Sequence, residues 1–361
     1  MFDSRGQYEQ IRHEIRQAID QLCESQAFTL GPAVERFERS LADYCGTAHA
    51  IGVSSGTDAL LCSLMAAGIG AGDEVICPAF TFFATAGSIA RTGARPVFAD
   101  IEPDSFNIDP AGIERLITPR TRAIMPVHLF GQVARMDAIS DIARRHGLLV
   151  IEDAAQAIGA RRGGRRACGF GLAGCLSFYP TKNLGAFGDA GAICTNDGNF
   201  AQLCRRLRVH GADRQYHHQT VGGMFRMAAI QATVLAVKLK YLDQWHEARR
   251  RNAAMYDRLL AGSGIITPHI DEQNWSIYNQ YCVRVPRRDH VRAALAERGV
   301  ETMVYYPLPL HLQECFRALG GKEGDCPQAE RACREVLALP IYPELKPEQI
   351  EYVAAQLRAV V

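Results

Sequence analysis

Residues 136–154 read MDAISDIARRHGLLVIEDA and contain the alternation that decides the fold. The first half carries apolar residues at helical spacing and ends in basic residues followed by Gly147, as helix C-termini do. The second half is a continuous apolar run, LLVI, that ends in Glu152 and Asp153. A helix that leads directly into a strand with two apolar faces is typical of a parallel sheet covered by helices.

The same alternation extends from Asp43 to about Lys240, where apolar runs such as EVICPAF and GAICTN alternate with helical patterns such as GTDALLCSLMAAGI. It predicts an α/β protein with a mostly parallel central sheet flanked by helices. One long helical pattern over residues 228–262 follows and resembles a connector between domains. We therefore predict a large domain over residues 1–240, including an N-terminal helical segment, and a smaller C-terminal α/β domain over residues 241–361.

Composition excludes several classes of function. The 361 residues carry a formal net charge of +1, so we expect neither a nucleic-acid partner nor a charged membrane surface. No run approaches the roughly 18 apolar residues of a membrane span. The twelve cysteines form no CxxC pair and no zinc pattern, which favours reduced thiols and no metal site. Because the first residues are polar and do not resemble an export signal, we expect a cytoplasmic protein.

Polar residues follow two of the predicted strands. In VSSGTDAL (53–60), Gly56 and Thr57 stand where a strand gives way to a helix, which suits either a phosphate seat or an ordinary helix cap. Asp153 ends a second strand and could hold a cationic ring nitrogen or cap the next segment. Gln156 lies about one helical turn further on and could face the same site. Ligands of open parallel sheets bind beyond such strand ends.

A single lysine lies in an unusual setting in GCLSFYPTKNLGAFGDAGAI (174–193). The chain has only five lysines, and Lys182 stands among glycines and apolar residues, 182 − 153 = 29 residues after Asp153. It is either a solvated charge or a buried amine whose pKa burial lowers. Ser177 could add a second phosphate contact. A phosphate seat, a carboxylate for a pyridinium nitrogen and an amine for an aldehyde together predict pyridoxal phosphate.

The chain resembles the DegT/DnrJ/EryC1/StrS family of sugar aminotransferases, within the fold-type I group of pyridoxal-phosphate enzymes. The resemblance covers nearly the whole chain, and its long motifs include SSGTDAL, GDEVICPAFTFFAT, VIEDAAQAIGA and LSFYPTKNLGAFGDAGAICTND. It implies an aminotransferase that cycles between pyridoxal and pyridoxamine phosphate, with glutamate as amino donor and a nucleotide-linked keto-sugar as acceptor. It also implies a homodimer with shared active sites.

The resemblance also implies roles for individual residues. Lys182 would form the covalent link to the cofactor, Asp153 would contact its pyridine nitrogen, and Gln156 would lie near its ring hydroxyl. Phe82, in TFFAT, would stack on the ring, although plain core packing is the alternative. The residues implied to hold the phosphate are Gly56, Thr57 and Ser177.

Two segments of the sequence bear on the identity of the acceptor sugar. HGADRQYHHQTVGGMFR (210–226) resembles members that act on nucleotide-linked 3-keto sugars, and Arg226 could bind a carboxylate or diphosphate, or form an ordinary ion pair. Tyr306 and His311, in YYPLPLHLQ (305–313), are candidate sugar contacts unless this Pro-rich segment is only a rigid loop. A 4-keto sugar, or a catalytically weak regulatory or binding protein on the same fold, remains an alternative.

Two positions depart from the family pattern. Met224 stands where many members carry Asn, and Ala228 stands where an acidic residue is common. In those members this segment of the neighbouring subunit reaches the cofactor phosphate. Met has no hydrogen-bond donor for a phosphate, so we hypothesise either weaker retention of the cofactor or a water or backbone amide in place of the missing donor. Lys182 argues against a sugar dehydratase, because those relatives carry His at this position. A nicotinamide enzyme is disfavoured because the G-x-G of AGIGAGDEVI precedes a strand and does not follow one.

Overall fold

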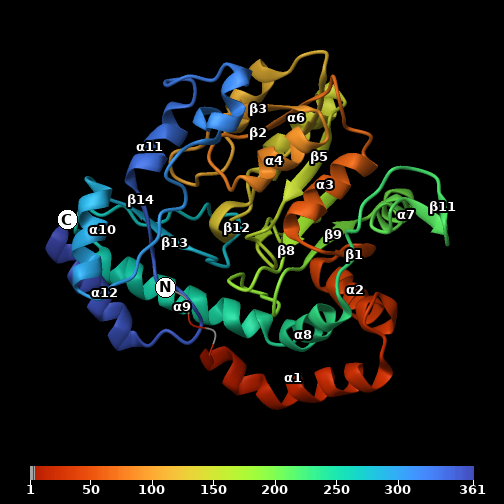
Figure 1. Ribbon diagram of the computed structural model, residues 1–361. Coiled ribbons are helices and arrows are strands. Elements are labelled where there is room, and N and C mark those ends of the chain that lie inside the picture. The colour runs from red at the N-terminus through yellow and green to blue at the C-terminus, as the bar shows by residue number, and fades with distance from the viewer. Residues whose placement is uncertain (1–2, 4) are drawn as a thin grey trace.

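The alternating pattern folds into one seven-stranded sheet in the order β1-β9-β8-β5-β4-β2-β3 (Figure 1). The computed structural model describes residue 3 and residues 5–361. Neighbouring strands are parallel except β9, which is antiparallel to both β1 and β8. The predicted α/β fold with a mostly parallel sheet is confirmed. The strands are β1 (His49–Val53), β2 (Glu74–Pro78), β3 (Arg95–Ala99), β4 (Thr121–Ile124), β5 (Leu149–Asp153), β8 (Ala173–Ser177) and β9 (Gly191–Thr195).

Helices cover both faces of this sheet, and two large apolar clusters fill the space between. The predicted helix after residue 135 is α6 (Met136–His146), which buries Met136, Ile139 and Ile142. It ends at Gly147, whose φ of 65° is the left-handed conformation that glycine adopts without strain. The other helices and helical turns of this part are α2 (Gly31–Cys45), α3 (Gly56–Ala66), α4 (Ala84–Arg91), α5 (Pro110–Ile113), η1 (Glu114–Leu116), η2 (Leu129–Gly131) and α7 (Gly198–Leu207).

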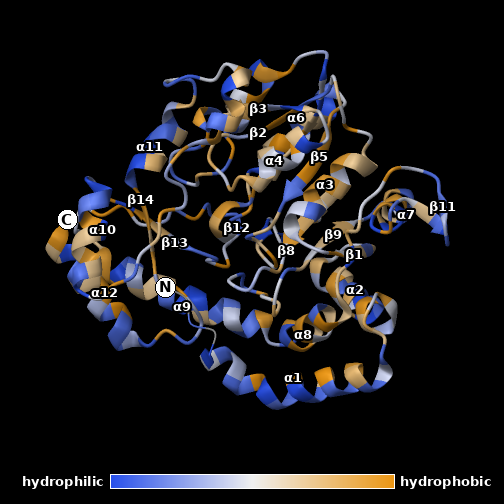
Figure 2. Ribbon diagram, viewed as in Figure 1, coloured by the Kyte–Doolittle hydropathy of each residue, from blue (hydrophilic) through white to orange (hydrophobic). Residues whose placement is uncertain are grey.

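The single long helix expected over residues 228–262 is in fact two helices, α8 (Ala229–Leu239) and α9 (Leu242–Leu260). At the break, Lys240 and Tyr241 both bond Glu14 of helix α1 (Arg5–Ser25), with Lys240 Nζ at 3.1 Å. The apolar α8 packs against α1 and α2, whereas the charged α9 runs on toward the C-terminal elements (Figure 2). The change of direction lets each half bury a different surface.

The C-terminal elements have an apolar cluster of their own, whose buried members all lie between residues 253 and 357. Two antiparallel strands, β13 (Tyr281–Arg284) and β14 (Val336–Leu339), form its sheet. The helices are α10 (Arg288–Glu297), α11 (Pro327–Glu335) and α12 (Pro347–Val360), with the turns η3 (Leu310–Leu312) and η4 (Glu314–Leu319). The proposed boundary at residue 240 stays a prediction.

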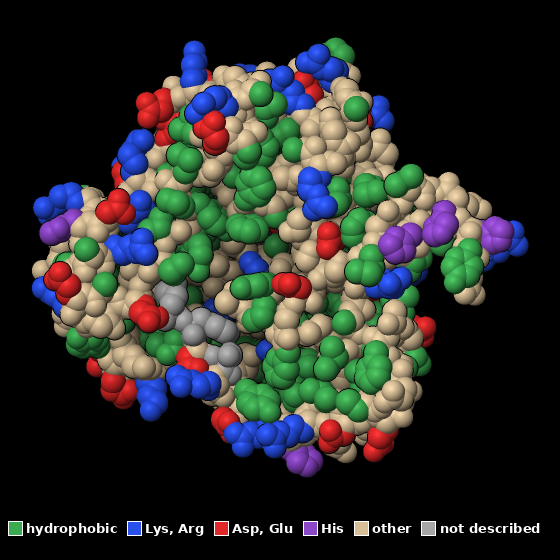
Figure 3. Space-filling view, in the orientation of Figure 1, with side chains coloured by type: hydrophobic (Ala, Val, Ile, Leu, Met, Phe, Trp, Pro, Cys, Tyr) green, Lys and Arg blue, Asp and Glu red, His purple; other side chains and the backbone are tan. Residues whose placement is uncertain are grey.

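Two smaller sheets complete the fold. In one of them, β12 (Asn274–Trp275) pairs with β6 (Arg161–Arg162), which pairs with β7 (Arg165–Arg166). In the other, β10 (Ala212–Arg214) and β11 (His217–His218) form an arm that projects from the body, and His side chains gather on it (Figures 1 and 3). Across the described part of the chain, we find no helix that is long and apolar enough to cross a membrane.

Candidate active site

The residues singled out from the sequence lie mostly beyond one edge of the sheet. Strands β1, β2, β5 and β8 all run in the same direction, because β9 is antiparallel to both β1 and β8. Their carboxyl ends are therefore at the same edge. Gly56 follows β1, Phe82 follows β2, Asp153 ends β5, and Lys182 follows β8. The topology thus brings Gly56 and Lys182 to the same edge of the sheet, although more than 120 residues separate them in the sequence.

Asp153 is a buried carboxylate held in place by neighbours. Its side chain is 4% exposed, and Oδ2 accepts a hydrogen bond of 2.8 Å from the hydroxyl of Thr85 on α4. Oδ1 accepts one of 3.2 Å from the Ala155 amide. Burial raises the pKa of the Asp153 carboxyl, while the Thr85 hydroxyl and the charge of Lys182 act in the opposite direction. Thr85 was missed in the sequence, where it is an ordinary helix residue.

Lys182 lies in the turn after β8, where its amide donates to the carbonyl of Tyr179 at 2.8 Å. Burial lowers the pKa of its ammonium to about 8, and the nearby charge of Asp153 partly opposes this shift. A substantial fraction of the side chain is thus a neutral amine near pH 8. This matches the chemical requirement for a nucleophilic lysine.

The start of α3 is pressed against the end of β8. A Cβ at Gly56 would lie 2.6 Å from Cβ of Ser177, so a side chain at this position would clash. Ser55 caps the helix by accepting a 3.0 Å bond from the amide of Asp58. The amides of Gly56 and Thr57 precede that cap bond at the positive end of the helix. With the hydroxyls of Thr57 and Ser177, they form a surface suited to phosphate.

Gln156, Phe82 and Tyr306 form a third group at the site. Gln156 is buried: its Oε1 accepts a 2.8 Å bond from the Phe130 amide, and its Nε2 donates to the Tyr306 hydroxyl at 3.0 Å. The Phe82 ring is 56% exposed and lies 6.1 Å from the Tyr306 ring. Phe82 is therefore available to contact a ligand, and Tyr306 is joined to the predicted cofactor residues.

The two other candidate substrate residues differ in their surroundings. Arg226 pairs with Val53 across an isolated antiparallel bridge, close to the start of α3. Among the described residues, no carboxylate oxygen lies within 4.0 Å of its guanidinium nitrogens. His311 is 3% exposed, and its Nε2 lies 3.1 Å from Glu330 Oε1. A sugar contact by His311 stays a prediction, and its burial does not favour it.

A second buried carboxylate was not singled out from the sequence. Glu152 is fully buried and accepts hydrogen bonds from His128 Nε2 at 2.9 Å and from the amides of Cys168, Phe170 and Gly171. His128 Nδ1 accepts from the Ala134 amide at 3.2 Å, so Nε2 carries the proton. This network anchors the loop between β7 and β8 beside Asp153.

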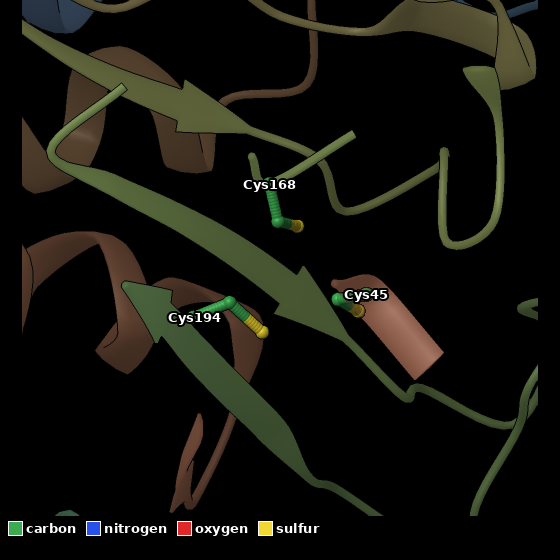
Figure 4. Close-up of side chains that lie close together, drawn as sticks. All are labelled: Cys45, Cys168 and Cys194. Atoms are coloured by element: carbon green, nitrogen blue, oxygen red, sulfur yellow. The ribbon is translucent and has the colours of Figure 1, made fainter. Parts of the chain in front are cut away.

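One group of metal-ligand side chains occurs among the described residues: Cys45, Cys168 and Cys194, whose sulfurs lie within 4.8 Å of one another (Figure 4). They come from α2, the loop after β7, and β9, so their spacing in the sequence could not reveal the cluster. Hydrogen bonding to Cys194 and Cys45, together with burial, holds the pKa of the Cys168 thiol well above its usual value. Hydrogen bonding to Cys168 and Cys194 holds the pKa of the Cys45 thiol well below its usual value, so the shifts within the cluster have opposite directions.

The residues at the sheet edge fit pyridoxal phosphate. Asp153 offers a carboxylate for a pyridinium nitrogen, Lys182 an amine with a lowered pKa for an aldehyde, and the start of α3 a seat for phosphate. Fold and site together define a pyridoxal-phosphate-dependent enzyme. The roles of the individual residues remain predictions.

The chain belongs to the DegT/DnrJ/EryC1/StrS aminotransferase family, whose model matches residues 9–358. It is 52% identical over 360 residues to the pleiotropic regulatory protein of Geobacillus stearothermophilus, covering 99% of this chain and 97% of that protein. It is 43% identical to UDP-2-acetamido-2-deoxy-3-oxo-D-glucuronate aminotransferase of Pseudomonas aeruginosa, covering 98% of each. S. venezuelae DesV, solved in complex with a ketimine intermediate, superposes with a TM-score of 0.97 at 44% identity, covering 99% of this chain and 96% of DesV. The chain is thus an aminotransferase that uses pyridoxal phosphate.

Proposed function

We propose that this aminotransferase converts a nucleotide-linked 3-keto sugar into the corresponding amino sugar, with glutamate as amino donor. The observation that carries the proposal is the shared sheet edge, where Lys182, Asp153 and the start of α3 meet. The 3-keto position is supported by the 3-oxo sugar in the name of the Pseudomonas aeruginosa relative. The glutamate donor follows from the family resemblance.

The chain's own residues account for the proton transfers. When bound, pyridoxal phosphate supplies an electron sink for a carbanion. Asp153 would keep the ring nitrogen protonated by pairing its negative charge with it. Neutral Lys182 Nζ would take a proton from the carbon of the amino donor that loses the amino group, and would deliver it to the carbon that receives the amino group. Amination of the keto sugar uses the same groups in the reverse order.

Arg226 is proposed to bind the anionic part of the substrate. It is half-buried beside the last residue of β1, and no carboxylate of the described chain neutralises it. A half-buried guanidinium without a carboxylate partner is suited to bidentate contact with a diphosphate or carboxylate. Tyr306 is proposed to line the sugar side of the site, because its hydroxyl accepts from Gln156 and its ring lies 6.1 Å from that of the exposed Phe82.

A homodimer with shared sites is proposed on the evidence of the projecting arm. The arm and the segment after it expose Tyr216 (84%), Val221 (86%) and Met224 (64%). Large apolar side chains that are this exposed on a projecting arm favour contact with another chain. Mass measurement by light scattering at several protein concentrations tests this, and a monomer at all of them would exclude the shared site.

The decisive experiment loads the protein with pyridoxamine phosphate and offers a panel of UDP- and dTDP-linked 3-keto and 4-keto sugars. We expect single-turnover amination of 3-keto members, with Lys182→Ala as the inactive control. Amination of 4-keto members alone would replace the proposed substrate by the 4-keto alternative. Amination of none would favour the regulatory reading that the name of the Geobacillus stearothermophilus relative suggests.

A further inference from the structure

The turn that carries Lys182 is held from one side by helix α8 (Figure 1). Lys238 on α8 is only 5% exposed, and its Nζ donates a 2.5 Å hydrogen bond to the carbonyl of Gly185, three residues after Lys182. The same Nζ lies 5.8 Å from the centroid of the Phe187 ring and 6.0 Å from that of Trp245. A buried ammonium is therefore directed at the backbone of this turn.

Gln231 lies seven residues earlier, about two helical turns away on the same side of α8. Its Oε1 accepts a 2.8 Å bond from the Phe187 amide, and its Nε2 donates to the Phe187 carbonyl at 3.2 Å. One side chain thus pairs both polar groups of one backbone residue, as a neighbouring strand would. Two side chains of α8 hold the backbone at Gly185 and Phe187.

The clamped turn is also packed against itself. A Cβ at Gly185 would lie 2.3 Å from the carbonyl oxygen of Pro180, so the chain returns on itself at a distance only glycine allows. The next amide, of Ala186, donates to the carbonyl of Phe178 at 2.8 Å. Through these contacts, a displacement of Gly185 would reach both sides of Lys182.

If Lys238 served packing alone, burial of its ammonium would cost desolvation free energy without a benefit. Its Nζ donates to the Gly185 carbonyl. In the part of the chain that the structure describes, no carboxylate lies within 4.0 Å of this Nζ. Burial lowers the pKa of its ammonium to about 8, and the charge of Glu344 opposes this only partly. A methionine would fill a similar volume without desolvating a charge. The hydrogen bond to Gly185 is what the lysine adds.

We propose that Lys238 and Gln231 are positioning residues that hold the Lys182 turn in the geometry needed for reaction. The inference rests on the proposed role of Lys182. Small displacements of a reacting group cost about 10²-fold in rate. Loss of the clamp should therefore lower kcat far more than it raises KM, because both side chains bond the backbone of the turn and neither is proposed to bind the substrate.

The test compares Lys238→Met and Gln231→Leu, which keep the approximate volume and remove the hydrogen bonds. Lys240→Met is the matched control, since Lys240 lies two residues on, is exposed, and pairs with Glu14. Hydrogen–deuterium exchange of the segment 178–190 is measured in the cofactor-free protein. We expect about tenfold faster exchange in both clamp variants and wild-type exchange in Lys240→Met.

A second readout follows the visible absorbance of the loaded protein as a function of pH. The clamp variants should shift its midpoint and lower kcat by about 10- to 100-fold, and Lys238→Arg, which can still donate to Gly185, should restore part of both. Wild-type exchange and an unshifted midpoint in Lys238→Met and Gln231→Leu would overturn the proposal. If one variant does not fold, the other decides. Covalent cofactor binding by Lys182→Ala would refute the role of Lys182, whereas the exchange result reports on the clamp itself.

Discussion

The hydroxyl of Thr85 donates a 2.8 Å hydrogen bond to the buried carboxylate of Asp153, across 68 residues of sequence. This bond stabilises the charged form of a group whose pKa burial raises. The negative charge that the proposed role of Asp153 requires therefore depends on a residue of helix α4.

Replacing Thr85 by Val should lower cofactor affinity and shift the pH dependence of kcat/KM, because the carboxyl of Asp153 loses a hydrogen bond. Without the hydroxyl, the pKa of the carboxyl rises further, so more of it is protonated at a given pH. The acidic limb of the kcat/KM profile should move to higher pH, and cofactor affinity should fall by about tenfold, as expected for a hydrogen bond to a charged group. Thr85→Ser keeps the hydroxyl and should behave as wild type. An unchanged acidic limb in Thr85→Val would show that the bond does not tune Asp153.

The reactivity of Lys182 should follow its lowered pKa. Its amine is neutral above about pH 8, so labelling by an amine-specific reagent in the cofactor-free protein should rise through that pH. Mass spectrometry of the digest measures the extent, with the exposed Lys322 as reference in the same sample. In Asp153→Asn, which removes the opposing negative charge, the midpoint should fall below that of wild type. A midpoint that stays near 10.5, the ordinary lysine value, would contradict the burial argument.

Adding one methyl group at Gly56 should damage the proposed phosphate seat. In Gly56→Ala, the new Cβ would clash with Ser177, and overpacking of this kind costs about 1–3 kcal/mol. We expect a lower melting temperature and faster loss of cofactor on dialysis. Gly198 is the matched control because it also starts a helix, and a Cβ there meets only His49 Nε2 at 3.6 Å. Equal effects in both alanine variants would show that Gly56 has no special role in binding the phosphate.

Restoring a donor at position 224 should improve cofactor retention. The Met224 side chain is 64% exposed and offers no hydrogen-bond donor. Met224→Asn should slow dissociation of the cofactor by about tenfold, corresponding to one hydrogen bond to a charged group. The measurement is the decay of visible absorbance after dilution. Met224→Leu should match wild type, and an equally slow decay in Leu and Asn would assign any gain to packing.

Removing the carboxylate of Glu152 should destabilise the fold. Its loss in Glu152→Ala leaves three backbone amides and His128 Nε2 without their acceptor. Each buried unpaired group costs about 1–3 kcal/mol, so the melting temperature should fall steeply. Glu152→Gln keeps one acceptor oxygen and should fall less. Wild-type stability of Glu152→Ala would mean that water satisfies these groups.

Much of the fold was readable from local patterns. The apolar runs at residues 49–53, 74–78, 149–153 and 191–195 are strands in the structure, and the helix ending at Gly147 ends as predicted. The long helix over residues 228–262 was wrong as a single element. At the break, Lys240 and Tyr241 bond Glu14, a distant residue that no local pattern includes.

The sequence by itself determined the alternation of helices and strands and the residue types at the strand ends, because hydrophobic periodicity and glycine positions act over a few neighbouring residues. Only the tertiary structure decided that Thr85 would bond Asp153, that Gln156 would hold Tyr306, and that α8 would clamp the Lys182 turn. These relationships join residues 53 to 150 positions apart. They arise from the order in which strands and helices pack, which no short segment encodes.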